Sequence, residues 1–360
     1  MAERVYLDWN ATAPLRPEAR DAMLAAMDVV GNPSSVHAEG RAAKAIVERA
    51  RGQVAALCGC KPGEVVFTSG ATEAARVLEN ALDGCDVLVD ETAHDAVWAH
   101  VDMGAWSARP NGPGHTLAMG LANSETGVVT DPPEKVEGQY PFGRARADWL
   151  FLDVTQAVGR IPWSFHWSGA DMACLSAHKL GGPKGVGALI ARDGFDFDAL
   201  QEGGGQELGR RSGTENVIGI AGFGAACEAA QRDQGDGVWD EVEKLRNILD
   251  STLAADAKET IFVGKDSARL PNTSCFVTPG WKGETQVMQM DLAGFAVSSG
   301  SACSSGKVKV PRVLKAMGLD DQAAEGALRV SLGPTNTEDE VLRFAETWLK
   351  HEKRFRQRAA

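Results

Sequence analysis

Short apolar runs alternate along the chain with longer stretches in which apolar positions recur every three or four residues. The runs are rich in β-branched residues and bounded by glycine, whereas the longer stretches are rich in alanine. This alternation is typical of α/β proteins with a parallel sheet covered by helices on both faces. Over the first two thirds it predicts a helix at 41–57, a helix that begins at Ala71, and strands at 64–68, 86–89, 149–153, 172–175 and 186–190.

The pattern changes in the last third of the chain. Residues 216–253 have a helical period that is interrupted at 234–237, and a final helix is predicted from Thr337. Three strand-like runs lie between them, at 273–277, 295–298 and 327–332. We therefore expect a large domain over 14–235 and a smaller α+β domain made of 1–13 and 236–360.

Composition narrows the class of protein. The chain has 360 residues, of which 44% are hydrophobic and 24% charged, and its formal net charge is -12. This acidic balance argues against nucleic acid or an anionic membrane as a partner, because both attract basic surfaces. No apolar run approaches the roughly 18 residues that span a bilayer, and the first residues lack the apolar core of a signal peptide.

The cysteines favour a reducing compartment. Seven are scattered without paired spacing, which fits thiols better than a disulfide framework and makes the cytoplasm the expected location. Cys58 and Cys60 have no second Cys/His pair nearby, so no metal site is expected. The cysteines expected to be buried or uninvolved are Cys58, Cys60, Cys85, Cys174, Cys227 and Cys275.

The most informative string for chemistry is Ser-Ala-His-Lys-Leu-Gly-Gly-Pro-Lys-Gly at 176–185. It follows an apolar strand and ends in a glycine-rich turn before the next strand. A lysine at the mouth of a sheet, with Ser and His just before it, suits an amine that binds a carbonyl cofactor beside a phosphate. A surface turn with two lysines is the alternative interpretation of this string alone.

Three further segments support a phosphate-bearing cofactor. Residues 68–73 form a strand, a glycine turn and a helix start, where N–H groups and a hydroxyl can hold phosphate. Asp153 ends a buried strand and can pair with a protonated ring nitrogen. Residues 210–216 offer hydroxyl and amide donors at another helix start. Each signal is weak, but their order along the chain makes the set strong.

A different kind of signal lies at 298–306, Ser-Ser-Gly-Ser-Ala-Cys-Ser-Ser-Gly. Cys303 lies there among small polar residues, with Lys307 and Lys309 close behind. Exposure and nearby cations favour the thiolate, which is the nucleophilic form. We therefore interpret Cys303 as a reactive cysteine, in contrast to the others.

These segments together resemble the cysteine desulfurases of the NifS/IscS type, within the class V aminotransferase superfamily. The resemblance runs almost end to end, through Tyr6-Leu7-Asp8, 31–37 and 329–333, and the cysteine segment 298–306 is its most specific part. It implies the fold of type I pyridoxal-phosphate-dependent transferases, with pyridoxal 5'-phosphate as cofactor and L-cysteine as substrate.

The resemblance also implies a role for individual residues around the cofactor. Lys179 would hold the cofactor covalently and later move the substrate α-proton. His94 would stack on the pyridine ring and act in acid–base steps, Asp153 would pair with the pyridine nitrogen, and Gln156 would contact the phenolic oxygen. The residues that would hold the phosphate are Gly70, Ala71, Thr72, Ser176 and His178, with Thr214 reaching the phosphate of the neighbouring subunit in a homodimer.

Further roles concern the substrate. Arg329 would clamp the substrate carboxylate with its planar fork, assisted by Asn32. Cys303 would attack the substrate sulfur and carry it as a persulfide, leaving L-alanine. Ser124 stands where the family usually has an asparagine that touches the cofactor and the substrate; its shorter hydroxyl would need a bridging water.

Two alternatives share most of these residues. A class V aminotransferase or another β-lyase would need Lys179, Asp153 and His94 but no mobile thiol, and a selenocysteine lyase usually has a shorter loop around its cysteine. A catalytically silent interaction protein is disfavoured by the intact set of site residues. A sulfur-acceptor protein, an iron–sulfur scaffold or a sulfur carrier, is an expected partner, but the resemblance does not identify it.

Overall fold

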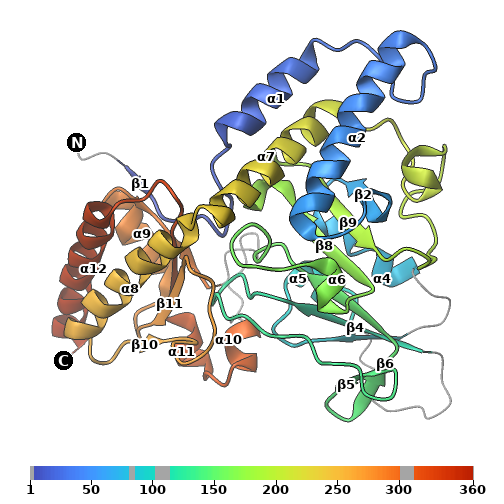
Figure 1. The fold of residues 1–360 in the computed structure, drawn as a ribbon. Helices are drawn as coiled ribbons and strands as arrows, with labels where there is room; N and C mark the ends of the chain where they lie inside the picture. The colour runs from blue at the N-terminus through green and yellow to red at the C-terminus, as the bar shows by residue number, and fades with distance from the viewer. Residues whose placement is uncertain (1–3, 81–85, 102–113, 301–311, 360) are drawn as a thin grey trace. The chain divides into compact units, whose positions relative to one another are not determined.

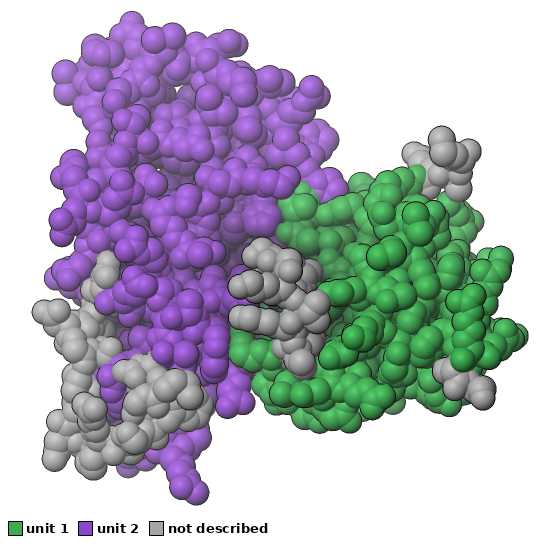
Figure 2. Space-filling model, turned by 180° about the vertical axis from the view of Figure 1, so that it is seen from behind, with its two compact units in different colours: residues 1–13, 122–130, 235–360 green, residues 14–121, 131–234 purple. Residues whose placement is uncertain are grey.

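The computed structural model describes residues 4–80, 86–101, 114–300 and 312–359. It divides into two compact units (Figures 1 and 2). Unit 1 comprises residues 1–13, 122–130 and 235–360, and unit 2 comprises 14–121 and 131–234. The difference from the expected boundaries is the segment 122–130, which belongs to unit 1 although it lies in the middle of the larger unit's sequence.

Unit 2 is built around a six-stranded sheet with the strand order β2-β9-β8-β7-β4-β3. Four neighbouring strands, β8, β7, β4 and β3, run parallel to one another. The strands are β2 (Val65–Thr68), β3 (Asp86–Val89), β4 (His115–Gly120), β7 (Trp149–Asp153), β8 (Met172–Ser176) and β9 (Gly187–Ala191). Strands β7, β8 and β9 are almost wholly buried, because helices or loops cover both faces.

The expectation of parallel strands was wrong for β9. It pairs antiparallel with both β8 and β2. The connection from β8 to β9 consists only of residues 177–186, without a crossover helix, whereas a parallel connection needs a crossover of a dozen or more residues. The apolar pattern does not reveal strand direction, since a buried strand of either direction is continuously apolar.

The remaining elements of unit 2 are helices and one hairpin. The predicted helix at 41–57 is α2 (Ala38–Cys58), and the predicted start at Ala71 is that of a single turn, α3 (Ala71–Ala74). The others are α1 (Pro17–Met27), α4 (Val77–Asn80), α5 (Asp95–Trp98), α6 (Phe165–Ser168), α7 (Val217–Gly235) and the hairpin of β5 (Tyr140–Phe142) and β6 (Ala145–Ala147).

Unit 1 has a four-stranded sheet with the order β10-β11-β14-β13, all antiparallel, and a two-stranded parallel pair of β1 and β12. The predicted strand at 295–298 is therefore two strands, because the chain changes pairing partner at Val297. The strands are β1 (Val5–Tyr6), β10 (Ile261–Phe262), β11 (Thr273–Val277), β12 (Phe295–Ala296), β13 (Ser298–Ser299) and β14 (Ala327–Ser331).

Helices pack on this smaller sheet around an aromatic core. Phe276, Phe344 and Trp348 are fully buried there, and the rings of Phe276 and Trp348 meet edge to face at 5.1 Å. The helices that contribute to this core are α8 (Val238–Asp256), α9 (Gly283–Leu292) and α12 (Glu338–Ala359). Helices α10 (Arg312–Ala316) and α11 (Asp321–Glu325) pack in a second apolar cluster with Cys275 and Val277 of β11. No helix among the described residues is both long and apolar enough to cross a membrane.

Candidate active site

Most of the predicted cofactor residues lie along one edge of the sheet in unit 2. Strands β2, β3, β4, β7 and β8 point in the same direction, so their carboxyl ends meet at that edge. Ligands of open α/β sheets bind outside these carboxyl ends. Five of the predicted residues end these strands or follow them within five residues: Gly70 after β2, His94 after β3, Asp153 and Ser176 at the ends of β7 and β8, and Lys179 three residues after β8.

Lys179 is placed by a single helical turn. The residues Ala177–Lys179 form a 3₁₀ turn after β8, and the N–H of Gly182 returns to the carbonyl of Ala177 at 2.9 Å. An ideal Cβ built on Gly182 would lie 2.9 Å from the Cβ of Ala177, so a larger residue there would force the turn to shift. The turn therefore presents the half-buried Lys179 directly at the strand end.

Asp153 is a buried carboxylate at the centre of the edge. Its Oδ1 accepts the N–H of Thr155 at 3.0 Å, and its side chain is close enough to Cys174 to raise the pKa of that thiol further, after burial. Among the described residues no lysine or arginine forms an ion pair with Asp153. A buried carboxylate of this kind suits a cationic ring N–H as its partner.

Two of the predicted phosphate-binding residues, Gly70 and Ser176, lie close together where glycine allows close approach. Gly70 has a φ of 159° and its ideal Cβ would lie 3.7 Å from Oγ of Ser176. A Cβ on Gly187 would lie only 2.6 Å from Cα of Gly70, so β9 passes the Gly70 turn without room for a side chain. Because α3 is a single turn, its dipole contributes little, and hydroxyl and backbone donors must do most of the binding.

His178 is electrostatically unusual. Burial lowers the pKa of its imidazole to about 4, assisted by the positive charges of Lys179 and Lys184. The ring is therefore neutral at physiological pH in the cofactor-free chain. A neutral imidazole still donates one hydrogen bond, so His178 can serve as a donor to phosphate.

Gln156 is held by an arginine that the sequence analysis did not single out. Nη1 of Arg160 donates to Oε1 of Gln156 at 2.7 Å, and Nη2 donates to the carbonyl of Lys179 at 3.0 Å. Arg160 and Gln156 are both buried. Since Oε1 accepts from Arg160, the amide group is oriented with its NH₂ as the donor for another oxygen.

His94 is the N-cap residue of α5. Its Nδ1 accepts the N–H of Ala96 at 3.1 Å, so in the neutral ring the proton lies on Nε2. The ring is half-buried. This capping contact fixes the ring's orientation at the carboxyl end of β3.

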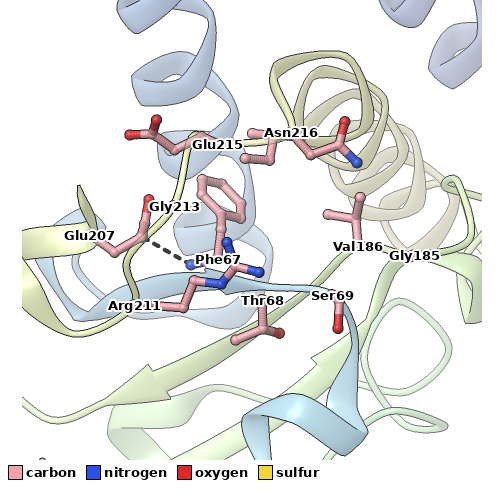
Figure 3. Close-up of a pocket in the computed structure, with 11 residues that line it drawn as sticks. Phe67, Thr68, Ser69, Gly185, Val186, Glu207, Arg211, Gly213, Glu215 and Asn216 are labelled. Carbon is pink, nitrogen blue, oxygen red and sulfur yellow. Dashed lines mark hydrogen bonds between the residues drawn. The ribbon is translucent and has the colours of Figure 1, made fainter. Parts of the chain in front are cut away.

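Thr214 lies three residues after Arg211, which forms an ion pair with Glu73 of α3. Arg211 Nε contacts Glu73 Oε1 at 2.9 Å, and Oε2 of Glu73 accepts the N–H of Ser69 at 2.7 Å. Figure 3 shows Arg211 and Ser69 on the wall of a pocket of about 60 Å³. Thr214 itself is exposed.

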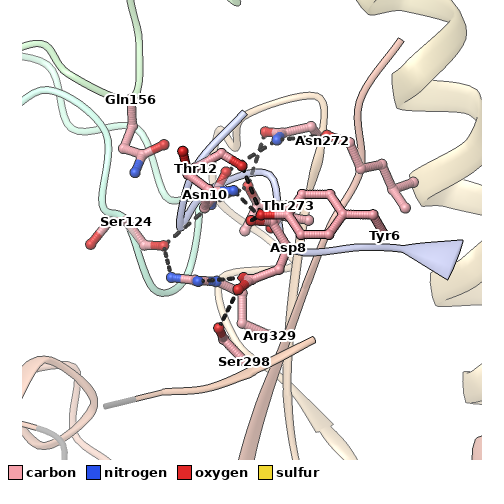
Figure 4. Close-up of polar contacts among 12 residues, drawn as sticks. Tyr6, Asp8, Asn10, Thr12, Ser124, Gln156, Asn272, Thr273, Ser298 and Arg329 are labelled. Carbon is pink, nitrogen blue, oxygen red and sulfur yellow. Dashed lines mark hydrogen bonds and ion pairs between the residues drawn. The ribbon is translucent and has the colours of Figure 1, made fainter. Parts of the chain in front are cut away.

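In unit 1, Arg329 lies in β14 with only 3% of its surface exposed. Nη1 donates to the carbonyl of Ser124 at 2.9 Å, and Nη2 forms an ion pair with Oδ1 of Asp8 at 2.8 Å (Figure 4). Nε has no hydrogen-bond partner among the described residues. A buried guanidinium with an N–H that lacks a partner is suited to a carboxylate ligand.

The other two residues expected to bind the substrate, Ser124 and Asn32, behave differently. Ser124 contributes its carbonyl to Arg329, while its hydroxyl points away from the guanidinium (Figure 4). Asn32 lies in the other unit, is exposed, and uses its Oδ1 to accept the N–H of Ser34 at 2.9 Å. Because Ser124 contacts Arg329 through its backbone carbonyl, this contact does not depend on the side chain at position 124.

The described cysteines are poor nucleophiles. Burial raises the thiol pKa of Cys60 and Cys275 to about 12, and that of Cys58, Cys174 and Cys227 also lies above its ordinary value. Four of these are fully buried, as expected from the apolar runs around them. Cys85 and Cys303 lie outside the described residues.

Known proteins match this chain over nearly its full length. Residues 5–105 and 115–344 match the family model described as Aminotransferase class-V. A cysteine desulfurase of Frankia sp. (strain EuIK1) is 42% identical over 95% of this chain and 90% of that protein. A cysteine desulfurase of Cereibacter sphaeroides is 38% identical over 96% of this chain and 94% of that protein. The solved NifS-like protein from Rickettsia africae ESF-5 superposes with a TM-score of 0.84 at 29% identity, covering 97% of this chain and 99% of that one.

The chain thus belongs to the class V aminotransferase family, with the type I fold of pyridoxal-phosphate enzymes. This family depends on pyridoxal phosphate. The residues of unit 2 fit pyridoxal phosphate. One edge of the sheet carries the amine of Lys179 and the buried carboxylate of Asp153, which has no cationic partner among the described residues. The turn at Gly70 lies beside the hydroxyl of Ser176 and offers N–H donors for phosphate. The predicted fold and cofactor are confirmed.

Four residues around the site were not assigned roles from the sequence: Arg160, Arg211, Glu73 and Asp8. Asp8 and Arg211 lay inside the segments that carried the resemblance, but their partners are distant in the chain. Arg160 lies four residues after Gln156, a helical spacing that could have suggested contact. The Asp8–Arg329 pair spans 321 residues, and no local pattern reveals it.

Proposed function

We propose that this protein is a cysteine desulfurase, which converts L-cysteine to L-alanine and transfers the sulfur to Cys303. The observation that carries this proposal is the identity of 38–42% to proteins named cysteine desulfurase over almost the whole chain. The arrangement of Lys179, Asp153 and Gln156 at one sheet edge supports it, as does the buried guanidinium of Arg329.

Each residue has a physical task in this reaction. Lys179 holds pyridoxal phosphate and then moves the substrate α-proton with its Nζ. Asp153 holds the ring nitrogen, and the NH₂ of Gln156 holds the phenolic oxygen. When bound, the cofactor supplies an electron sink that stabilises negative charge at the substrate α-carbon.

The other cofactor contacts follow the same logic. Gly70, Ala71, Thr72, Ser176 and the neutral His178 bind the phosphate through N–H and hydroxyl donors. His94, whose ring is oriented by the N–H of Ala96, would act in acid–base steps. Arg329 binds the substrate carboxylate, and the backbone carbonyl of Ser124 orients its guanidinium.

Sulfur transfer is a displacement at the substrate sulfur. The Cys303 thiolate forms a new S–S bond as the Cβ–S bond of the substrate breaks. The electron pair of the broken bond stays with the carbon skeleton, which takes up protons and leaves as L-alanine. One molecule of cysteine and one thiol thus become alanine and a Cys303 persulfide, without an external oxidant.

One assay tests this function. L-Cysteine is supplied with a reductant, and sulfide and L-alanine are quantified together. Equal amounts are expected from the wild type, and Cys303→Ser should bind the cofactor but form no persulfide. Cys60→Ser is the control, because that thiol has a pKa raised to about 12 by burial. If Cys303→Ser desulfurates at the wild-type rate, the sulfur-relay role is wrong.

The same assay separates the alternatives. An aminotransferase would convert the amino acid to a keto acid and release no sulfide. A selenocysteine lyase would act on selenocysteine far better than on L-cysteine.

We further propose a homodimer in which Thr214 reaches the phosphate of the neighbouring subunit, since Thr214 is exposed and follows the anchored Arg211. Mixing inactive Lys179→Ala and Thr214→Ala chains should then restore activity, because one site of each hybrid has both wild-type residues. No restoration would mean that Thr214 serves its own subunit.

The persulfide also needs an acceptor. We propose a sulfur-acceptor protein for iron–sulfur clusters or another thio-cofactor, and a cytoplasmic location, which the odd number of cysteines and their unpaired state among the described residues support. Transfer of ³⁵S from the protein carrying a labelled persulfide to candidate acceptor proteins tests the proposed acceptor directly.

A further inference from the structure

The N-terminal segment supplies the ion-pair partner of the buried arginine in unit 1. Asp8 and Arg329 are 321 residues apart, yet Oδ1 of Asp8 lies 2.8 Å from Nη2 of Arg329. Their side chains are 16% and 4% exposed. A buried cation without a partner is strongly unfavourable, so Asp8 is the group that lets Arg329 remain inside unit 1.

The contact leaves the guanidinium able to bind a second carboxylate. Asp8 uses only one oxygen on Arg329, because its Oδ2 accepts the hydroxyl of Ser298 at 2.8 Å. The carbonyl of Ser124 takes one N–H of the other terminal nitrogen, and Nε has no partner among the described residues. Asp8 therefore does not itself form a two-pronged contact with the guanidinium, and Nε stays without a partner among the described residues.

The backbone that carries Asp8 is fixed on both sides. The N–H of Leu7 donates to the carbonyl of Ala296 at 2.9 Å, and the N–H of Ser331 donates to the carbonyl of Leu7 at 2.9 Å. Trp9 then donates to the carbonyl of Ser331 at 3.1 Å. The segment is thus tied to β14, the strand that carries Arg329.

The second partner of the guanidinium is fixed in the same way. Nδ2 of Asn10 donates to the carbonyl of Ser124 at 3.2 Å and to Oγ1 of Thr273 at 2.9 Å, while Nδ2 of Asn272 donates to Oδ1 of Asn10 at 3.1 Å (Figure 4). The N-terminal segment therefore provides one partner of the guanidinium, Asp8, and through Asn10 it holds the other partner, the carbonyl of Ser124. A planar fork held at two of its three nitrogens keeps one orientation.

We propose that Asp8 is a positioning residue for substrate recognition: it orients the guanidinium of Arg329 for the carboxylate of the amino-acid substrate. This inference rests on the proposed role of Arg329. Asp8 acts through Arg329 and does not touch the substrate. If Asp8 instead competed with the substrate carboxylate, it would bind the guanidinium with both oxygens and would have to be displaced. Its contact through a single oxygen favours the positioning role.

The test compares carboxylate recognition in variants of the holoenzyme. Asp8→Ala should raise the KM for L-cysteine about tenfold and change kcat less than about threefold. Asp8→Asn keeps the shape and one weaker hydrogen bond, so it should recover most of the loss. The second readout is the ratio of the competitive inhibition constants of L-alaninamide and L-alanine, which differ only in the carboxylate; Asp8→Ala should lower this ratio about tenfold.

Two further variants make the outcome decisive. Asp291→Asn removes a carboxylate of the same unit whose ion pair with Arg4 is exposed, and it should leave both readouts unchanged. Arg329→Gln should bring the ratio of the two inhibition constants close to one. If it does not, the proposed role of Arg329 fails. If it does while Asp8→Ala leaves the ratio unchanged, or lowers the KM, the role of Asp8 is refuted and that of Arg329 stands.

Discussion

Arg160 donates a hydrogen bond of 2.7 Å to the side-chain oxygen of Gln156. Its other terminal nitrogen reaches the carbonyl of Lys179 at 3.0 Å. One buried cation thus ties the residue proposed for the cofactor's phenolic oxygen to the residue proposed to hold the cofactor covalently. The two lie on different loops, and Arg160 sets their relative position within unit 2.

Replacing Arg160 should therefore weaken cofactor binding through Gln156. We expect Arg160→Met to raise the dissociation constant of pyridoxal phosphate about tenfold, because the amide of Gln156 loses the contact that orients it. A double-mutant cycle with Gln156→Ala should show a coupling of about 1–2 kcal/mol, measured by cofactor titration. Arg192→Met, which removes a half-exposed arginine of the same unit, is the control. Additive effects of the two replacements would contradict the link.

A second prediction concerns the stability of the loop before Thr214. Glu207 is buried and accepts two hydrogen bonds of 2.8 Å from Arg51, in addition to the N–H of Phe67. Glu207→Ala would leave Arg51 buried without its main partner, at a cost of about 3–5 kcal/mol. Glu48 contacts the same arginine from an exposed position, so Glu48→Ala should cost less than about 1 kcal/mol.

Chemical unfolding of the two variants measures this difference. Glu207 also has a positive φ of 49°, as does its neighbour Leu208 with 59°. Such backbone is unfavourable for residues other than glycine, so the ion pair must hold this turn in place. Equal stability losses in the two variants would show that Glu207 is not the anchor.

A third prediction is a pH dependence from His178. Its pKa is about 4 in the folded chain and about 6.5 when unfolded, so the unfolded state takes up the proton first as the pH falls. The folded state should therefore lose stability between about pH 6.5 and pH 4. After allowance for the partly exposed ring the loss is on the order of 1–2 kcal/mol.

Urea unfolding of the cofactor-free protein at pH 7.5 and pH 4.5 checks this effect. His178→Asn should remove this part of the difference between the two pH values. Binding of an anionic phosphate should also reduce it, since a nearby negative charge raises the pKa of the imidazole. An equal pH dependence in the wild type and His178→Asn would mean that other groups dominate.

A fourth prediction concerns Ser124. Since its carbonyl, not its hydroxyl, contacts Arg329, Ser124→Ala should change the KM for L-cysteine by no more than about twofold. Asn10→Ala should raise it more, because the Ser124 carbonyl then loses the amide that holds it. Steady-state kinetics with both variants decide the point. A large effect of Ser124→Ala would instead show that the hydroxyl acts on the substrate, as the sequence suggested.

The sequence was a good guide wherever the signal is local. Apolar runs located β2, β3, β7, β8, β11 and β14 within a residue or two, because a short buried strand must be continuously apolar. The break at 234–237 separated α7 from α8 correctly. By contrast, β4 and the β5–β6 hairpin were not predicted, and strand direction was wrong for β9.

The sequence by itself determined the family, the cofactor and the identity of the candidate residues, because these depend on motifs a few residues long. The tertiary structure alone decided which distant groups pair with them. Asp8 lies beside Arg329, Arg160 beside the Lys179 carbonyl, and Glu207 beside Arg51. Burying each of these arginines requires a partner close in space, and that partner can come from any part of the chain that the fold brings near.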